Sequence, residues 1–245
     1  MPVRTNRMKQ KLREGLPVFG GLLRTPEPTL VEVLGYAGYD YVVLDAEHGA
    51  HGFEALDMLI LTAYASDITP IVRVNENTPG LIMRVLDIGA QGVLVPHIKT
   101  ADDARRAVAA ALYPPDGARG IGPNRGSQFG AIPGDEYFKP INDEVAVMLM
   151  MEEAGAVENI ETITDVTGIT ALSIGLSDLS GSLGVPGQAN HPSVQAAVDT
   201  LMAVAARKGI PVSLPVRASR RSAMPARKGP AWPMSERWKR CCIRH

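Results

Sequence analysis

Residues 92–112 read GVLVPHIKTADDARRAVAAAL and contain one complete strand-then-helix unit. The apolar run 92–95 predicts a short buried strand, because the strands of a parallel sheet are covered on both faces and have continuous hydrophobic sequences. Thr100 and Asp103 have the spacing of a capping box, which predicts a helix over residues 101–112. A strand that leads directly into a helix is the building unit of α/β folds.

The same unit recurs from residue 16 to residue 213. Apolar runs that predict strands lie at residues 18–23, 41–44, 71–74, 92–95, 145–151, 170–174 and 210–212. Amphipathic stretches separate them, such as 194–207, which Lys208 and Gly209 close. Seven strands in regular order predict a (β/α)8 TIM barrel over residues 1–213, with its eighth βα unit missing or replaced. A doubly wound open sheet is the less favoured alternative, because no glycine-rich phosphate loop follows the first strand.

The last 32 residues differ in composition from the rest of the chain. Residues 1–213 carry 16 Lys+Arg and 25 Asp+Glu, a net charge of −9, whereas 214–245 carry 9 Lys+Arg and a single acid, a net charge of +8. This last segment has neither helical nor strand periodicity. We interpret it as an aberrant basic tail, produced by a shifted reading frame or disordered; a nucleic-acid-binding arm is the alternative.

Composition excludes several classes of protein. The chain is 45% hydrophobic and 21% charged, as ordinary globular domains are. No apolar run approaches the ~18 residues of a membrane span, and the basic start of the chain lacks the apolar core of a signal peptide. We expect a cytoplasmic protein with no membrane or nucleic-acid partner. The adjacent Cys241 and Cys242 have no metal-ligand spacing.

Polar residues gather where the predicted strands end. The sequence Asp45-Ala46-Glu47-His48-Gly49 follows the second run, Arg73 lies in the third, Pro96-His97 follows the fourth, Glu152-Glu153 the fifth, and Ser177-Asp178 the sixth. The carboxyl ends of barrel strands meet on one face, which carries the active site. Two carboxylates, Glu152 and Asp178, with no Cys or His beside them, favour a hard divalent cation. Such an ion polarises a ketone and stabilises an enolate, and no lysine at a strand end offers a Schiff base instead.

Each of these residues also has a structural interpretation. Glu152 can be an acid at a helix N-terminus and Asp178 a helix cap. Arg73 can pair with a carboxylate inside the barrel, and His48 can be a hydrogen-bonded loop residue. The remaining histidines of the fold, His51, His97 and His191, are interpreted as structural or surface residues.

Several motifs follow one another in an order shared with a known family. They are LDAEHG, PIVRVN, VLDIGAQGVLVPHIKTADDARRAV, YPPDGARGIG, MMEEAGAVENI and IGLSDLSGSLG. From about residue 16 to residue 213 the chain resembles the HpcH/HpaI aldolases, the metal-dependent class II pyruvate aldolases of aromatic catabolism, which include 4-hydroxy-2-oxoheptanedioate and 2-keto-3-deoxy-sugar-acid aldolases. The resemblance implies a TIM barrel and a homo-oligomer, the family hexamer. It also implies reversible cleavage of 4-hydroxy-2-oxoacids to pyruvate and an aldehyde, through an enolate stabilised by Mg²⁺, Mn²⁺ or Co²⁺.

The resemblance also assigns residues to roles in substrate and metal binding. Glu152 and Asp178 match the two metal ligands of the family. Arg73 matches the arginine that holds the keto oxygen of pyruvate and stabilises the enolate. The backbone amides of Ser177 and Asp178 match those that bind the pyruvate carboxylate, in agreement with the anion preference of helix N-termini.

A second group of matching residues concerns proton transfer and the aldehyde. His48 matches the histidine that moves a proton on or off the aldol hydroxyl, and Asp45 and Asp87 match acids near that histidine and the aldehyde pocket. The chain departs from its relatives at Met150, where a glutamine is common, and after Ser213, where an eighth βα unit is expected. Two alternatives remain: an acyl-CoA lyase of the citrate lyase β type, disfavoured because only Arg24 lies near the first strand, and an inactive truncated scaffold.

Overall fold

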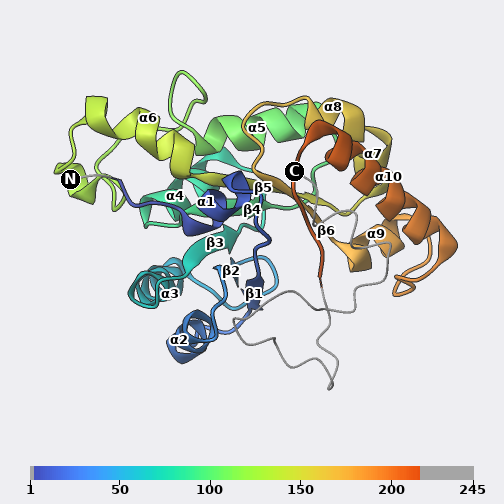
Figure 1. The fold of residues 1–245 in the computed structure, drawn as a ribbon, viewed down its shortest axis with the longest axis horizontal. Coiled ribbons are helices and arrows are strands. Elements are labelled where there is room, and N and C mark those ends of the chain that lie inside the picture. The colour runs from blue at the N-terminus through green and yellow to red at the C-terminus, as the bar shows by residue number, and fades with distance from the viewer. Residues whose placement is uncertain (1–2, 216–245) are drawn as a thin grey trace.

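The computed structural model describes residues 3–215 and arranges them around one parallel β-sheet (Figure 1). The strands are β1 (Gly20–Leu23), β2 (Tyr41–Asp45), β3 (Thr69–Arg73), β4 (Gly92–Val95), β5 (Ala146–Met151), β6 (Ala171–Ile174) and β7 (Val212–Ser213). The helices are α1 (Arg7–Arg13), α2 (Pro28–Tyr36), α3 (Phe53–Ala65), α4 (Pro79–Asp87), α5 (Ala101–Ala111), η1 (Gln128–Gly130), α6 (Gly134–Glu144), α7 (Ala154–Glu158), α8 (Ile160–Thr164), α9 (Leu176–Ser182) and α10 (Pro192–Lys208). Neighbouring strands in the sheet are consecutive in the sequence, in the order β1 to β7.

The seven strands lie at the seven predicted apolar runs, so the α/β prediction is confirmed. All residues of β2, β3, β4 and β5 are buried, which explains their unbroken hydrophobic sequences. The predicted boundaries differ by one or two residues; β3 begins at Thr69 instead of Ile71, because Thr69 and Pro70 continue the ladder with β2. The sheet curls on itself: the Tyr41 hydroxyl on β2 lies 3.4 Å from the Ser213 hydroxyl on β7.

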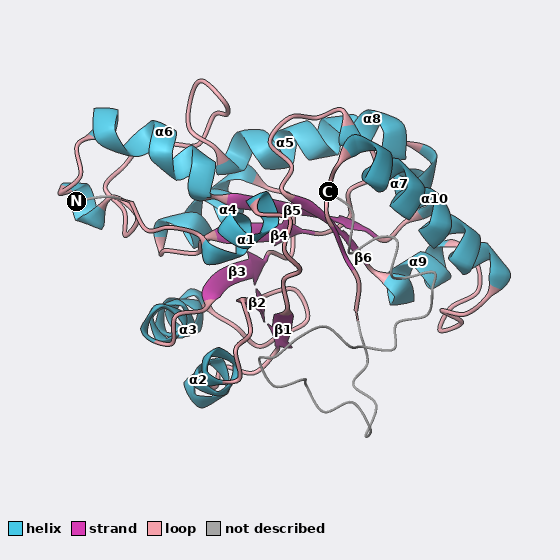
Figure 2. Cartoon of the chain, in the orientation of Figure 1, coloured by secondary structure: helices cyan, strands magenta, loops and turns pink. Residues whose placement is uncertain are grey.

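Helices cover the outer face of this curled sheet (Figure 2). The largest apolar cluster lies between sheet and helices, and α3 contributes Leu56, Leu59, Ile60 and Ala63 to it, which lie on one face of the helix. The predicted capping box of α5 is confirmed, with reciprocal hydrogen bonds between Thr100 and Asp103. The outer helices thereby hold each strand in place and fix where its carboxyl end lies.

A second, smaller cluster fills the inside of the curl. It consists of Met8, Tyr41, Val43, Ile71, Leu94, Ala146, Met148, Met150 and Ala171. Met8 comes from α1, a helix that the sequence analysis did not predict, and is 1% exposed. The side-chain amide of Asn6, at the start of α1, donates to the carbonyls of Gln91 and Glu144, which precede β4 and β5. The helix α1 therefore closes the end of the sheet where the strands begin.

Between residues 3 and 215 the outer sides of β1 and β7 have no strand partner. Leu22 on β1 shares its register position with Val43 of the inner cluster, yet it is 54% exposed. Residues 3–215 thus contribute seven strands to this sheet, and the eighth βα unit of a complete TIM barrel, which the sequence analysis expects to be missing or replaced, is not found among them. The predicted tail at 214–245 lies almost wholly outside the described residues.

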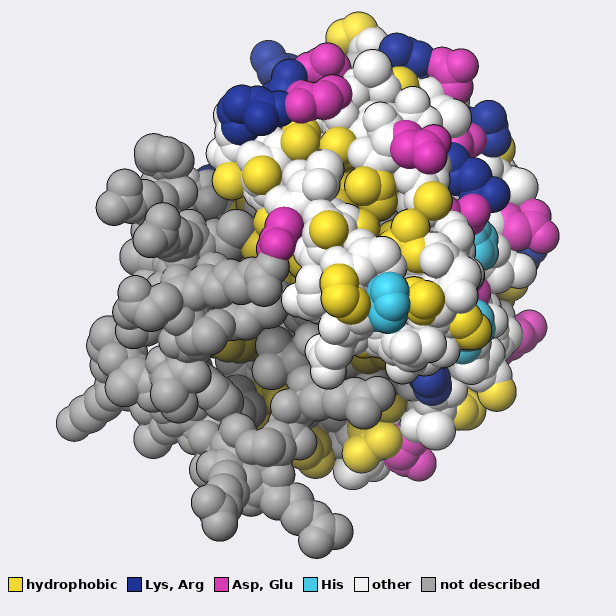
Figure 3. All heavy atoms as spheres, turned by 90° about the vertical axis from the view of Figure 1, so that its right-hand side faces the viewer, with side chains coloured by type: hydrophobic (Ala, Val, Ile, Leu, Met, Phe, Trp, Pro, Cys, Tyr) yellow, Lys and Arg dark blue, Asp and Glu magenta, His cyan; other side chains and the backbone are white. Residues whose placement is uncertain are grey.

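The surface that carries α9 and α10 mixes acidic and basic side chains (Figure 3). At the end of α10, Arg207 pairs with Glu161, and Lys208 with Asp165. None of the helices between residues 3 and 215 is long and apolar enough to cross a membrane.

Candidate active site

The carboxyl ends of the strands bring the predicted polar residues to one end of the sheet. Asp45 is the last residue of β2 and Arg73 the last of β3, and the two are register partners. Glu152 directly follows β5, and Asp178 lies in the first turn of α9, just after β6. Parallel pairing alone thus gathers residues that are up to 133 positions apart in the sequence.

Asp45 and Arg73 form a buried ion pair. Arg73 donates from Nε to Asp45 Oδ1 at 2.8 Å and from Nη2 to Oδ2 at 2.5 Å, a two-point contact. Burial alone raises the pKa of Asp45, but hydrogen bonds from Arg73, from the His48 N–H and from Arg24 outweigh it and lower the pKa to about 2. Asp45 is therefore a carboxylate at neutral pH, and it fixes the plane of the Arg73 guanidinium.

Glu152 is a buried carboxylate with an unusual environment. It is 1% exposed, and its Oε1 accepts a hydrogen bond of 2.8 Å from the His97 N–H. Burial raises its pKa, which the His97 N–H partly offsets and the nearby charges of Glu47 and Asp178 increase. Gly175 makes room for it, because a Cβ there would lie 2.8 Å from Glu152 Oε2. A buried carboxylate beside other carboxylates is the setting in which a cation stabilises the fold.

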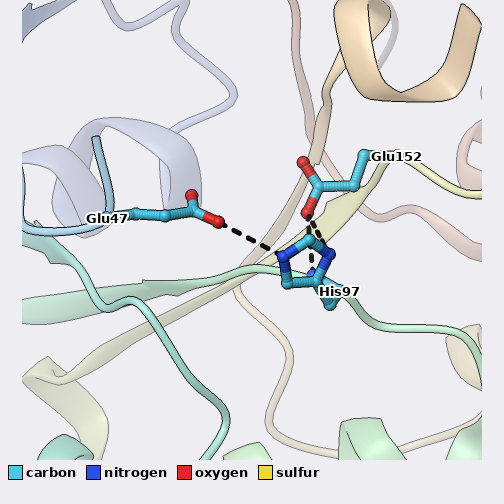
Figure 4. Close-up of side chains that lie close together, drawn as sticks. All are labelled: Glu47, His97 and Glu152. Atoms are coloured by element: carbon cyan, nitrogen blue, oxygen red, sulfur yellow. Dashed lines mark hydrogen bonds and ion pairs between the residues drawn. The ribbon is translucent and has the colours of Figure 1, made fainter. Parts of the chain in front are cut away.

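His97 lies between two carboxylates (Figure 4). Its Nε2 is 3.3 Å from Glu47 Oε1, and its Nδ1 is 3.4 Å from Glu152 Oε1 and 3.1 Å from Glu153 Oε1. One ligand atom from each of Glu47, His97 and Glu152 lies within 4.8 Å of the others, so this group could hold a metal ion. Carboxylate oxygens with an imidazole nitrogen suit a divalent cation of the first transition row as well as Mg²⁺.

The structure corrects the expectation that no histidine lies beside the acidic pair. His97, interpreted from the sequence as structural or surface, has a left-handed backbone with φ of 56°. This conformation, uncommon outside glycine, turns both its N–H and its ring toward Glu152. The only signal in the sequence was its place after a strand, which Pro96-His97 shares with the other candidates.

Glu47 is the second residue whose contacts the sequence analysis did not assign. Its Oε2 lies 3.0 Å from Arg73 Nη1, an ion pair without a hydrogen bond. It therefore joins the Asp45–Arg73 pair to the group around His97. Its position two residues after a strand end, next to Asp45 and His48, was visible in the sequence.

The other predicted residues surround Arg73 and Glu152 and differ in how far they are buried. Asp178 and Ser177 are exposed in the first turn of α9, where backbone N–H groups have no partner within the helix. The His48 N–H donates to Asp45 Oδ1 at 3.1 Å, and the His48 ring lies 4.0 Å from Glu47. Met150 lies inside the curl, with its sulfur 3.9 Å from Arg73 Nη1.

Asp87 is not brought to this cluster within the chain. It is the last residue of α4, just before β4 begins, and its carboxylate accepts from Arg119 Nη2 at 2.6 Å. That position lies toward the end of the sheet where the strands start. His51 and His191 behave as predicted, the first bonded to the Leu23 carbonyl and the second capping α10.

Comparison with known proteins gives the class of this one. The HpcH/HpaI aldolase/citrate lyase family model matches residues 22–229. The chain is 37% identical over 219 residues to a 5-keto-4-deoxy-D-glucarate aldolase of Klebsiella pneumoniae, covering 88% of this chain and 85% of that one. It is 38% identical over 200 residues to a 2-keto-3-deoxy-L-rhamnonate aldolase of Escherichia coli, covering 80% and 73%.

A solved structure agrees with these relatives. An HpcH/HpaI aldolase/citrate lyase family protein from Burkholderia cenocepacia superimposes with a TM-score of 0.81 at 34% identity, covering 86% of this chain and 84% of that one. Fold, strand-end cluster and relatives together define a carbon–carbon lyase of the aldolase class. The chain belongs to the HpcH/HpaI aldolase/citrate lyase family, which confirms the resemblance seen in its motifs.

Proposed function

We propose that this protein is a class II aldolase that cleaves 4-hydroxy-2-oxoacids reversibly to pyruvate and an aldehyde. The observation that carries the proposal is the convergence of Arg73 with Asp45, Glu47 and Glu152 at the carboxyl ends of β2, β3 and β5. A fixed cation beside a buried carboxylate group is what the negative charge of an enolate requires. The names of the relatives, aldolases of keto-deoxy sugar acids, support the same reaction.

Arg73 is proposed to hold the keto oxygen of pyruvate. Two of its donors, Nε and Nη2, are bonded to Asp45, whereas Nη1 makes only a weak hydrogen bond to the Met150 sulfur at 3.9 Å and an ion pair with Glu47 at 3.0 Å. Nη1 is therefore the donor available to a ligand. Its charge is in place before the reaction begins, because Asp45 fixes the guanidinium plane.

Glu152 and Asp178 are proposed to hold a divalent metal ion, Mg²⁺, Mn²⁺ or Co²⁺. The donor chemistry fits, since Glu152 is buried with a raised pKa among other acids and has Glu47 and His97 within 4.8 Å. A bound ion would supply a Lewis acid for the keto oxygen of pyruvate. The N–H groups of Ser177 and Asp178 are proposed to bind the pyruvate carboxylate.

His48 is proposed to move the proton of the aldol hydroxyl. Its backbone is held by Asp45, while its ring is about half exposed on the side from which an aldehyde would enter. Asp45 orients both His48 and Arg73 through its two carboxylate oxygens. A role for Asp87 at the aldehyde pocket stays a prediction, because in this chain its carboxylate binds Arg119.

The wider setting of the protein remains proposed as well. We propose a cytoplasmic homo-oligomer with no membrane or nucleic-acid partner. The division of the chain at residue 213 into a barrel domain and an aberrant basic tail stays a prediction, because residues 216–245 lie outside the described part of the chain and the family model extends to residue 229.

The test is the exchange of pyruvate methyl protons in D₂O, followed by NMR after removal of Mn²⁺, with EDTA as a control. It reports enolisation without requiring the correct aldehyde. Arg73→Ala should slow exchange by about 100-fold or more, whereas Arg105→Ala, an exposed arginine on α5, should not. Exchange that persists in Arg73→Ala, or that resists EDTA in the parent protein, contradicts the proposal.

His48→Ala separates the proton-transfer role from the rest. If His48 serves the aldol hydroxyl, the variant should lose aldol cleavage while retaining most of the pyruvate exchange. Equal losses in both assays would assign His48 to enolisation or to folding.

A further inference from the structure

Asp45 is held by two arginines, one from each neighbouring strand. Arg73, at the end of β3, contacts both of its carboxylate oxygens. Arg24, directly after β1, donates from Nε to Asp45 Oδ2 at 2.9 Å. Asp45 and Arg73 are register partners, and Arg24 follows Leu23, whose partner Leu44 precedes Asp45, so the three residues lie in neighbouring positions at the carboxyl ends of β1, β2 and β3.

The two arginines differ in what they leave free. The Arg73 side chain is 7% exposed, and all three of its nitrogens have neighbours in the protein. The Arg24 side chain is 57% exposed and binds Asp45 through Nε alone. Among the described residues no contact occupies Nη1 or Nη2 of Arg24. These two nitrogens therefore present a planar pair of donors to solvent at the mouth of the site.

The position of Arg24 is fixed from several sides. The Ala50 N–H donates to the Arg24 carbonyl at 3.3 Å, and the His51 ring binds the carbonyl of Leu23 at 3.1 Å. Gly49 packs so closely that a Cβ there would lie 2.9 Å from the Arg24 carbonyl oxygen. The loop after β2 thus holds the backbone at the end of β1 in place, and Asp45 fixes the Arg24 side chain through its Nε. An arginine held in this way loses less rotational freedom when it binds a ligand than an unanchored surface arginine does.

The charges of the residues around the carboxyl ends of the strands indicate which kind of ligand group Arg24 would bind. Beyond Arg73 lie the carboxylates of Glu47, Glu152 and Asp178, and the charges of Glu47 and Asp178 act on Glu152. The cation on that side, Lys99, is paired with Glu153 at 2.9 Å. When the keto acid of a ligand lies at Arg73 and α9, a second anionic group on the same ligand is therefore attracted toward Arg24.

We propose that Arg24 is a specificity-determining residue that binds a carboxylate on the aldehyde part of the substrate. The substrate class is then a 4-hydroxy-2-oxoacid with a second acid group at its far end. This inference rests on the proposed aldolase function and extends it from pyruvate to the second substrate. The planar Nη pair matches the two oxygens of a carboxylate. A phosphate, with its larger negative charge, is disfavoured by the acidic residues of the mouth.

The test compares aldehydes that differ in charge. Aldol addition of pyruvate is measured with glyoxylate against glycolaldehyde, which have the same carbon number, and with 4-oxobutanoate against butanal. Glyceraldehyde 3-phosphate against glyceraldehyde reports on phosphate. The readout is the ratio of kcat/KM for the anionic aldehyde to kcat/KM for its neutral partner, with kcat and KM determined separately.

Arg24→Met should lower this ratio by about 10- to 100-fold for the better carboxylate pair, the range expected for a charge-assisted hydrogen bond. The loss should fall mainly on KM for the anionic aldehyde, and Arg24→Lys should recover part of it. The matched control is Arg105→Met, because the Arg105 side chain is 62% exposed against 57% for Arg24 and pairs with Asp102 on α5. This control should leave the ratio as it is in the parent protein.

The outcomes test the role of Arg24 separately from the aldolase function. If the parent protein exchanges pyruvate protons but Arg24→Met lowers both members of each pair equally, Arg24 acts only through Asp45 and the inference is wrong. A ratio that changes for the phosphate pair alone overturns the carboxylate class. Absence of metal-dependent pyruvate exchange in the parent protein overturns the aldolase function and this inference with it.

Discussion

Replacing Gly175 by alanine tests whether Glu152 has to lie where the structure places it. A Cβ at residue 175 would lie 2.8 Å from both Cβ and Oε2 of Glu152, and 3.2 Å from the Met150 methyl group. Ordinary van der Waals contact begins near 3.4 Å, so Glu152 has to move by about 0.6 Å. Its buried side chain has little room to do so, because Oε1 is held by the His97 N–H.

The size of the effect follows from this crowding. Overpacking a well-packed site costs about 1 to 3 kcal/mol. If the carboxylate yields and the backbone does not, the cost falls on metal binding. Since 1.4 kcal/mol corresponds to a factor of ten, affinity for Mn²⁺ should fall by about 5- to 150-fold.

The assay is a titration with Mn²⁺ in which electron paramagnetic resonance reports the free ion. Circular dichroism on the same samples shows whether the fold is retained. Gly181→Ala is the matched control, because it lies in the same helix, α9, and a Cβ there meets nothing within 4 Å. The control should bind Mn²⁺ as the parent does and gain about 0.5 to 1 kcal/mol of stability, as alanine does over glycine in helices.

The reasoning is refuted if folded Gly175→Ala binds Mn²⁺ as tightly as Gly181→Ala does. That result would mean either that the Glu152 carboxylate is no ligand or that the site accommodates the extra methyl group. Glu152→Gln distinguishes the two, because it removes the charge without adding volume at residue 175.

Three further outcomes are expected. Burial raises the pKa of Asp45, but hydrogen bonds, led by those of Arg73, outweigh it and lower the pKa from 3.8 to about 2. The ionised Asp45 therefore stabilises the folded state fully above pH 4, and this contribution is lost as the pH falls toward 2. Acid unfolding should show the loss in the parent protein and not in Asp45→Asn. Because burial raises the pKa of Glu152, its ionised form destabilises the metal-free fold as pH rises past 4.5, and Glu152→Gln should melt higher than the parent in EDTA at pH 7. Met8→Ala should lower the free energy of unfolding in urea by about 2 to 5 kcal/mol, and exposed Met58→Ala by much less; similar losses would contradict the buried position of α1.

The parts of the fold that depend on burial could be predicted from the sequence. The strands β2 to β5 are buried along their whole length, so each contains an apolar run that the sequence shows directly. The helix α5 was predictable as well, because the capping box of Thr100 and Asp103 is a local interaction. Helix α1 was missed because its short sequence, RMKQKLR, has one buried residue, Met8, and only contacts with distant strands reveal its place.

The candidate site could be predicted only as far as strand ends identify it. Asp45, Arg73 and Glu152 stand at those ends, and parallel pairing brings them together without further information. The position of His97 depends on a left-handed backbone conformation that no local pattern specifies. Asp87 had no strand-end signal, and its assigned role came from the resemblance alone. The sequence likewise could not show which nitrogens of Arg24 are free, because this depends on the hydrogen bond between its Nε and Asp45.

Because α1 closes one end of the sheet, it determines the order in which two ligands bind to the site and leave it. Met8 blocks access from the strand amino ends, so in the described part of the chain Arg73 is reached from the strand carboxyl ends. A molecule held at Arg73 then lies beneath one held near Arg24, since the first side chain is 7% and the second 57% exposed. Entry and departure share one passage, and the last molecule to enter is the first to leave. In the cleavage direction the aldehyde should depart before pyruvate, which steady-state product inhibition would reveal as a compulsory sequence.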